Sequence, residues 1–287
     1  MPAFSRRRFL AAGAVALGGA ALYAGEVARH EIEVTSSLVF IAGLPEAFDG
    51  YRIAQLSDIH MDEFTEPFFL REIVRRINGL KPDAVFFTGD FVTRVLAPRK
   101  FAVGAAWQCA GILDGLDCRA RYAALGNHDF MVGAREVTAA LTAHGIQVLR
   151  DAHRPLERAG GRIWVAGLAD PVQGEPNPEA AIPAAIRNLP HEPIVLLCHA
   201  PDYADTMLQY PSGQAVSLML CGHTHGGQVR LPWIGPLVLP AMGHKYVEGW
   251  FRLGRLQLHV NRGIGAVGVP FRLNCPPEIS FFTLRSA

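Results

Sequence analysis

The sequence predicts an α/β fold in which the strands of a largely buried sheet alternate with helices that cover it. Several short apolar runs are bounded by polar turns, and near-continuous apolarity is typical of strands buried on both faces. Half of the 287 residues are apolar, so a large core can form. The predicted strands cover residues 51–56, 84–88, 121–125, 163–168, 194–198 and 217–221.

The crossover helices are predicted from the spacing of apolar residues. Between the first two strands, Phe69, Ile73 and Ile77 recur four residues apart, which places them on one face of a helix. Alternation of such helices with strands favours a sheet with helices outside it. The predicted helices cover residues 67–80, 102–113 and 134–144.

The remainder of the chain is expected to be less regular. The helix candidate 179–188 is interrupted by Pro183. Closing strands are predicted over residues 255–261 and 278–284. No linker divides the chain, so residues 26–287 are predicted to form a single domain.

The first 25 residues have the pattern of an export signal. Arg6, Arg7 and Arg8 precede an apolar stretch of small residues, 9–25, and this order resembles a twin-arginine signal. The stretch lies at the lower end of the length that spans a bilayer, and no sharp cleavage site follows it, so retention as a membrane anchor remains open. The sequence therefore predicts residues 1–25 as a twin-arginine signal or an N-terminal anchor. It also predicts export by the twin-arginine machinery to the periplasm or the outer face of the cytoplasmic membrane.

Charge and cysteine usage weigh against several classes of protein. The 27 basic and 26 acidic residues give a net charge of +1, which does not indicate a nucleic-acid partner. The five cysteines include no C-x-x-C pair, so neither a disulfide scaffold nor a thiolate zinc site is indicated. Cys109 and Cys118 are the pair close enough in sequence for a bridge, and free thiols are the alternative.

Ligand-type side chains follow five of the predicted strands. Each block alone is weak evidence, because a strand-end Asp-x-His is commonly a turn and a lone histidine is commonly a core residue. Together they are stronger, because ligands in open α/β sheets bind beyond the carboxyl ends of the strands. The blocks are Asp58-Ile59-His60, Gly89-Asp90, Gly126-Asn127-His128, Cys198-His199 and Gly222-His223-Thr224-His225.

In this order the blocks resemble the signature of calcineurin-like metallophosphoesterases, over residues 51–225. The segments GGQVRLP (226–232) and NCPPEI (274–279) are similar to those of a narrower bacterial branch, which includes exported phosphodiesterases and a hydrolase of UDP-diacylglucosamine. The resemblance implies a four-layer α/β/β/α sandwich with two central mixed sheets and outer helices.

The resemblance also implies a site for two divalent metal ions. Oxygen and imidazole donors without a thiolate suit Mn, Zn or Fe and leave the identity of the metal open. His128, next to the ligand Asn127, would face the substrate and protonate the leaving oxygen, and Asp129 would either orient the His128 ring or cap a turn. The implied ligands are Asp58, His60, Asp90 and His225 for one ion, and Asp90, Asn127, His199 and His223 for the other.

The predicted reaction is hydrolysis of a phosphodiester or pyrophosphate bond by in-line attack of a hydroxide that bridges the two ions. A phosphomonoesterase or phosphoprotein phosphatase on the same fold is one alternative, and a non-catalytic metal-binding envelope protein is another. Residues 231–239 are apolar, so they are expected either to form a wall or membrane-touching edge for a lipid-linked substrate or to enter the core. Trp233 and His244 are candidate substrate-binding residues.

Overall fold

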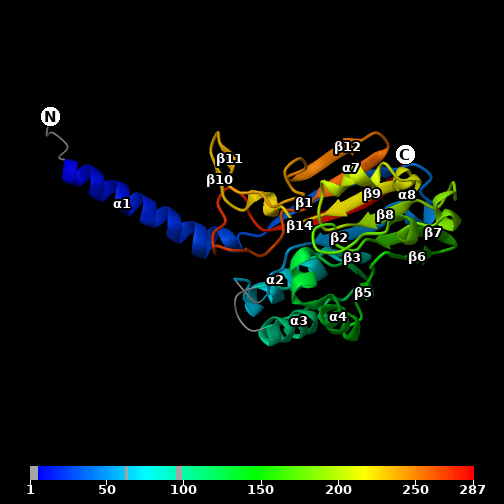
Figure 1. The fold of residues 1–287 in the computed structure, drawn as a ribbon, viewed down its shortest axis with the longest axis horizontal. Coiled ribbons are helices and arrows are strands. Elements are labelled where there is room, and N and C mark those ends of the chain that lie inside the picture. The colour runs from blue at the N-terminus through cyan, green and yellow to red at the C-terminus, as the bar shows by residue number, and fades with distance from the viewer. Residues whose placement is uncertain (1–5, 62–63, 95–98) are drawn as a thin grey trace.

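The structure is a computed structural model that describes residues 6–61, 64–94 and 99–287, with the side chains of only some residues in the first helix. Two six-stranded sheets lie at its centre, and helices lie outside them (Figure 1). Both sheets mix parallel and antiparallel pairs. The predicted fold class, a sandwich with two central mixed sheets and outer helices, is confirmed.

The first sheet is built mainly from the N-terminal half of the chain. In spatial order its strands are β1 (Glu33–Ile41), β14 (Glu278–Ser286), β2 (Arg52–Leu56), β3 (Ala84–Thr88), β4 (Ala120–Ala124) and β5 (Gln147–Val148). Strands β2 to β5 run parallel, so their carboxyl ends lie at one edge. The C-terminal strand β14 runs antiparallel to β2 and parallel to β1.

The second sheet is built from the later part of the chain. In spatial order its strands are β12 (Gly249–Leu253), β13 (Leu256–Val260), β9 (Val216–Cys221), β8 (Ile194–Leu197), β7 (Gly161–Gly167) and β6 (Ala152–Arg158). Its four inner strands are parallel, and one antiparallel strand pairs at each edge. Both sheets therefore have parallel central strands, and the carboxyl ends of these strands can meet at one site.

Helices complete the outer layers. The first sheet is covered by α2 (Pro67–Leu80), α3 (Arg99–Leu113) and α4 (Asn127–Ala143). Four short helices lie in the segments around the second sheet: α5 (Pro178–Ala181), α6 (Ala184–Arg187), α7 (Tyr203–Met207) and α8 (Pro211–Gln214). Helix α4 begins seven residues before the predicted start, at Asn127, with Gly126 as its N-cap. Gly133 (φ 143°) then interrupts the helical backbone.

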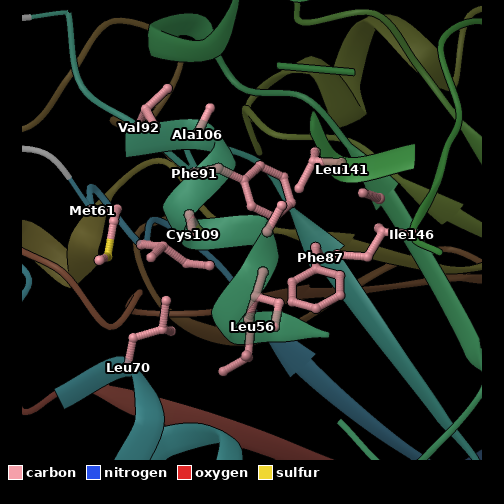
Figure 2. Close-up of a cluster of buried hydrophobic side chains, with 14 of the residues drawn as sticks. Leu56, Met61, Leu70, Phe87, Phe91, Val92, Ala106, Cys109, Leu141 and Ile146 are labelled. Carbon is pink, nitrogen blue, oxygen red and sulfur yellow. The ribbon is translucent and has the colours of Figure 1, made fainter. Parts of the chain in front are cut away.

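Strand β3 shows why the apolar runs are continuous. All of its residues are buried, and they alternate between two cores. Val85 and Phe87 enter the core under α2, α3 and α4, which Figure 2 shows around Phe87, Phe91 and Cys109. Ala84 and Phe86 enter the core between the two sheets. A strand covered on both faces needs apolar residues at every position.

The N-terminal helix α1 (Arg6–Leu22) extends away from the sheets, at the end of the molecule where the hairpin of β10 (Arg230–Leu231) and β11 (Gly235–Pro236) lies (Figure 1). Residues 1–5 of the predicted export signal lie outside the described residues. Within the described chain, no helix has the length and apolarity needed to cross a bilayer. The possible Cys109–Cys118 bridge is not formed: neither cysteine takes part in a disulfide, and Cys109 is buried in the core that α3 covers.

Candidate metal centre

The five sequence blocks meet where the strand ends of the two sheets face each other. The first three blocks follow β2, β3 and β4 of the first sheet, and the last two follow β8 and β9 of the second. The imidazole of His199 crosses between the sheets, and its Nδ1 lies 2.7 Å from the backbone oxygen of Thr88. The alignment of parallel strands in each sheet thus brings residues far apart in sequence into one buried cluster.

Glycines precede several of the ligand-type residues because nothing larger fits there. A Cβ on Gly222 would collide with the Oγ of Ser57 and the carboxylate of Asp58. A Cβ on Gly89 would lie 2.7 Å from Nδ1 of His199, and one on Gly126 would collide with the Asp90 carboxylate. The G-D, G-N-H and G-H-x-H patterns therefore reflect close packing of backbone against the cluster.

Left-handed backbone turns the ligand-type side chains inward directly after their strands. This conformation costs on the order of 1 kcal/mol for a residue other than glycine, and Asp and His are among the types that adopt it more readily. Its concentration at this cluster is typical of a functional site. The residues with positive φ here are Asp58 (51°), His60 (48°), Asp90 (56°), His223 (73°) and His225 (51°).

One group of possible metal ligands comprises Asp58, His60 and His225, all buried. The Nε2 atoms of His60 and His225 are 3.1 Å apart, and Nε2 of His225 is 3.4 Å from Oδ1 of Asp58. The other ring nitrogen of His60 is 2.8 Å from Oγ1 of Thr93, which fixes the orientation of the ring.

A second group comprises Asp90, His199 and His223, and Asn127 joins it. Nε2 of His199 lies 3.1 Å from Nδ1 of His223 and 3.1 Å from Oδ1 of Asn127. Oδ2 of Asp90 lies 3.2 Å from Nε2 of His199 and 3.6 Å from Nε2 of His60. One carboxylate oxygen is thus close to a ring from each group, as a bridging ligand requires.

These residues fit two divalent ions. Ligand atoms about 2.1 Å from one ion lie about 3 Å from one another, and the nitrogen and oxygen separations above match that spacing. The rear nitrogens of His199 and His223 face the backbone oxygens of Thr88 and Ala241, at 2.7 Å each, so both rings have fixed orientations. Fixing the rear of an imidazole in this way is the usual support of a metal-binding histidine.

The electrostatics of three of the four imidazoles favour the neutral form that binds metal, whereas Asp90 outweighs burial and raises the pKa of His199 well above its usual value. Burial lowers the pKa of His60 and His225 well below the usual range and that of His223 to about 4, so these rings are neutral at pH 7. Burial alone would raise the pKa of the Asp90 carboxyl, but His199 and His60 outweigh it and hold that pKa below its usual value. Asp90 is therefore ionised.

His128 is half-buried beside the cluster, and its ring lies 5.1 Å from that of His60, centroid to centroid. Its Nδ1 accepts a hydrogen bond from the backbone N–H of Arg94 at 3.0 Å. In the neutral ring this contact places the proton on Nε2, where it can be donated.

Asp129 does not orient the His128 ring, because adjacent residues of a helix point in different directions. Its buried carboxylate accepts backbone N–H groups of Gly126, Asp90, Phe91 and Val92 at 2.8–3.3 Å. Asp129 thereby ties the loop that carries Asp90 to the start of α4.

Beside the cluster lies a cavity of about 500 Å³. His128 and ligand-type residues line part of it, and aliphatic side chains line much of the rest. Neither Trp233 nor His244 lines this cavity: Trp233 is fully exposed on the turn between β10 and β11, and the backbone N–H of His244 donates to Asp202. Leu237 and Val238 of the same apolar segment line it instead.

A second stretch of the cavity wall was not anticipated from the sequence. Val267 and Val269 also line the cavity, and they lie in a loop between β13 and β14. The apolar, glycine-punctuated run of residues 263–270 is the signal that could have identified it, since it resembles the run 231–239.

Comparisons with known proteins agree with this geometry. A family model described as "Calcineurin-like phosphoesterase" matches residues 51–227, more than half of the chain. The chain belongs to the calcineurin-like phosphoesterase family. As a calcineurin-like phosphoesterase with two groups of metal ligands, it is a hydrolase with a dinuclear metal centre.

Three relatives of this calcineurin-like phosphoesterase match along most of their length. An uncharacterized metallophosphoesterase of Bacillus subtilis, YkuE, is 35% identical and covers 100% of this chain and 99% of its own. Phosphodiesterase YaeI of Escherichia coli is 30% identical and covers 98% and 99%. UDP-2,3-diacylglucosamine pyrophosphatase LpxG of Chlamydia trachomatis is 28% identical and covers 82% and 85%.

Substitution of Gly222 by alanine tests the packing of the metal centre. The added methyl group would displace Asp58, so we expect Gly222→Ala to weaken metal binding at least tenfold, measured by isothermal titration with Mn²⁺. Gly79→Ala is the control, because a Cβ at Gly79 in α2 meets no atom within 4 Å. Equal metal affinity of Gly222→Ala and the wild type would show that this contact does not position Asp58.

Proposed function

We propose that this phosphoesterase hydrolyses a phosphodiester or pyrophosphate bond in a lipid-linked substrate. The proposal rests on the mixed lining of the cavity, which combines the metal ligands and His128 with aliphatic side chains. A phosphoryl group fits the polar part of this lining, and an acyl or other apolar chain fits the aliphatic part. The aliphatic residues of the wall are Val229, Leu237, Val238, Val267 and Val269.

The charge around the cavity favours a diester with an apolar substituent over a phosphoprotein or a free nucleotide. No lysine or arginine side chain lines the cavity within the described residues. Arg230, the nearest candidate in sequence, forms an ion pair with Glu248 at 2.6 Å and donates to the backbone oxygen of Gly226. Two metal ions can neutralise the phosphoryl group that reacts, but the further phosphates of a free nucleotide usually contact such cations.

The relatives support the same substrate class. YaeI is named a phosphodiesterase, and LpxG is named a pyrophosphatase of UDP-2,3-diacylglucosamine, a molecule with both a pyrophosphate and acyl chains. A substrate of that general chemistry would place its phosphoryl group at the ligand cluster and its acyl chains along the wall.

The residues of the chain have separate roles in the proposed reaction. When bound, two divalent ions supply a hydroxide nucleophile near neutral pH and neutralise the phosphoryl oxygens. We assign Asp58, His60, Asp90 and His225 to one ion and Asp90, Asn127, His199 and His223 to the other. His128 donates the Nε2 proton to the leaving oxygen, and the backbone N–H of Arg94 keeps its ring in the productive tautomer.

The same end of the molecule presents apolar side chains to solvent. Arg272 at the end of the cavity-wall loop donates its backbone N–H to Ala24, and Phe271 packs on Gly25, so the loop and the base of α1 are joined. We propose that this face rests on the outer face of the cytoplasmic membrane after twin-arginine export, with residues 1–25 as signal or anchor. The exposed apolar residues on the two loops are Trp233, Ile234, Leu237, Val238, Val269 and Phe271.

Substitution of His128 tests the reaction. We expect His128→Ala to keep two metal ions per chain and to lose about 10²- to 10⁴-fold in kcat on a diester, the usual contribution of a general acid. The assay uses metal-stripped protein with Mn²⁺ or Zn²⁺ added back, on bis(p-nitrophenyl) phosphate and p-nitrophenyl phosphate. His244→Ala is the control, since that ring lies outside the cavity.

Loss of metal from His128→Ala would contradict the separation of acid from ligands. Faster turnover of the monoester than of the diester would favour the phosphomonoesterase alternative. Wild-type protein that binds metal but hydrolyses neither ester would favour a non-catalytic binding protein.

A double substitution of the cavity wall tests the substrate class. We expect Leu237→Ser with Val238→Ser to reduce kcat/KM on a lipid-linked diester about tenfold or more, because apolar contact with the chain is lost. Turnover of bis(p-nitrophenyl) phosphate should stay unchanged. Leu38→Ser with Phe40→Ser on β1 is the matched control, since both residues are exposed and lie outside the cavity. Equal losses on both substrates would exclude a lipid-specific wall.

A further inference from the structure

Arg272 is fully buried directly behind one of the metal-ligand groups. Its Nε donates to the backbone oxygen of Gly265 at 2.9 Å, its Nη1 to that of Cys275 at 3.1 Å, and its Nη2 to that of Arg262 at 2.9 Å. The same Nη2 lies 3.4 Å from Nδ1 of His225, the ring nitrogen that points away from the cluster. The guanidinium therefore joins three backbone carbonyls of one loop and packs beside the ring of a ligand-type histidine.

A buried arginine without a carboxylate partner is costly, so this position calls for an explanation. None of the ion pairs in the described part of the chain involves Arg272, whereas the neighbouring Arg262 pairs with Glu33 and Glu278. Taking a guanidinium out of water without a counter-ion costs several kcal/mol, offset only in part by carbonyl acceptors. A core residue chosen for packing alone would be apolar.

The loop that Arg272 organises also contacts Asp58, another member of the ligand group that contains His225. The backbone N–H groups of Ile264 and Gly265 donate to the backbone oxygens of Ser57 and Asp58, at 3.1 and 2.8 Å. The same Gly265 offers its own oxygen to Arg272. The guanidinium is thus two hydrogen bonds from the backbone of Asp58. Cys275, whose backbone oxygen it also holds, donates its thiol to the backbone oxygen of His225 at 3.0 Å.

The second ligand group has no such support. The rear nitrogen of His199 faces the backbone oxygen of Thr88, and that of His223 faces the backbone oxygen of Ala241. Neither ring takes part in a hydrogen bond with Arg272. The arginine therefore acts on one of the two groups.

We propose that Arg272 is a positioning residue for one metal ion, the one assigned to Asp58, His60 and His225. Its fork of hydrogen bonds to backbone carbonyls holds the loop 262–275 against the backbones of Asp58 and His225. The ion at His199 and His223 binds independently of it. This inference rests on the metal assignment of the proposed function. It adds that different residues hold the ligands of the two metal ions in place.

The test is metal binding by Arg272→Met and Arg272→Lys, measured by titration calorimetry with Mn²⁺ and by metal content after dialysis. We expect the wild type to bind two ions per chain. Arg272→Met should weaken one ion by about 10- to 100-fold, the usual effect of losing a residue that orients a ligand, and keep the other. Arg272→Lys keeps the charge but loses the fork, so it should give an intermediate affinity at the same position. Diester hydrolysis by Arg272→Met should recover at saturating Mn²⁺.

Arg262→Met is the matched control, from the same loop but with its ion pairs at the outer side. It should bind both ions as the wild type does. Two ions bound by Arg272→Met with wild-type affinity would overturn the proposal, as would equal weakening of both ions. Variants that fail to fold, judged by circular dichroism of the metal-free proteins, would make Arg272 a folding requirement instead. A wild-type protein that binds no metal would instead refute the proposed function itself.

Discussion

The whole centre depends on one carboxylate placed between the two sheets. Oδ2 of Asp90 lies within 3.6 Å of ring nitrogens of His60, from the first sheet, and His199, from the second. Its other oxygen accepts the backbone N–H of His128 at 2.9 Å, which places the candidate acid beside the cluster. Asp129 in turn holds the backbone of the Asp90 loop. The position of this one carboxylate therefore sets the distance between the two ligand groups and the position of His128 relative to both.

This arrangement is unfavourable for the metal-free protein and is retained by the surrounding fold. Left-handed backbone at five ligand-type residues, buried neutral imidazoles and a buried guanidinium each cost free energy. The opposing contribution comes from three apolar cores, under the α2–α4 layer, between the sheets and beyond the second sheet. Bound metal would add to it, since ligands that bind only the folded state stabilise that state.

The sequence allowed the central strands and the ligand blocks to be predicted, because strands buried on both faces are apolar throughout and a metal site needs a restricted set of residue types. Edge strands were missed for the opposite reason. Strand β6 is mostly exposed and contains Pro155, and β1 buries mainly its last residues, so neither forms a continuous apolar run. The sequence left two roles open for Asp129, and the capping role is the one the structure shows. The choice was not predictable, because backbone N–H groups are present at every residue but proline. The role of Arg272 was likewise not predictable from the sequence, because the groups that accept its hydrogen bonds are backbone carbonyls.

The central claim is that two metal ions bind on either side of Asp90. Anomalous diffraction from a crystal grown with Mn²⁺ tests it most directly. We expect two anomalous peaks about 3.5–4 Å apart, both within bonding distance of the Asp90 carboxylate, one beside His225 and the other beside His223. A single peak, or peaks that Asp90 does not contact, would contradict it.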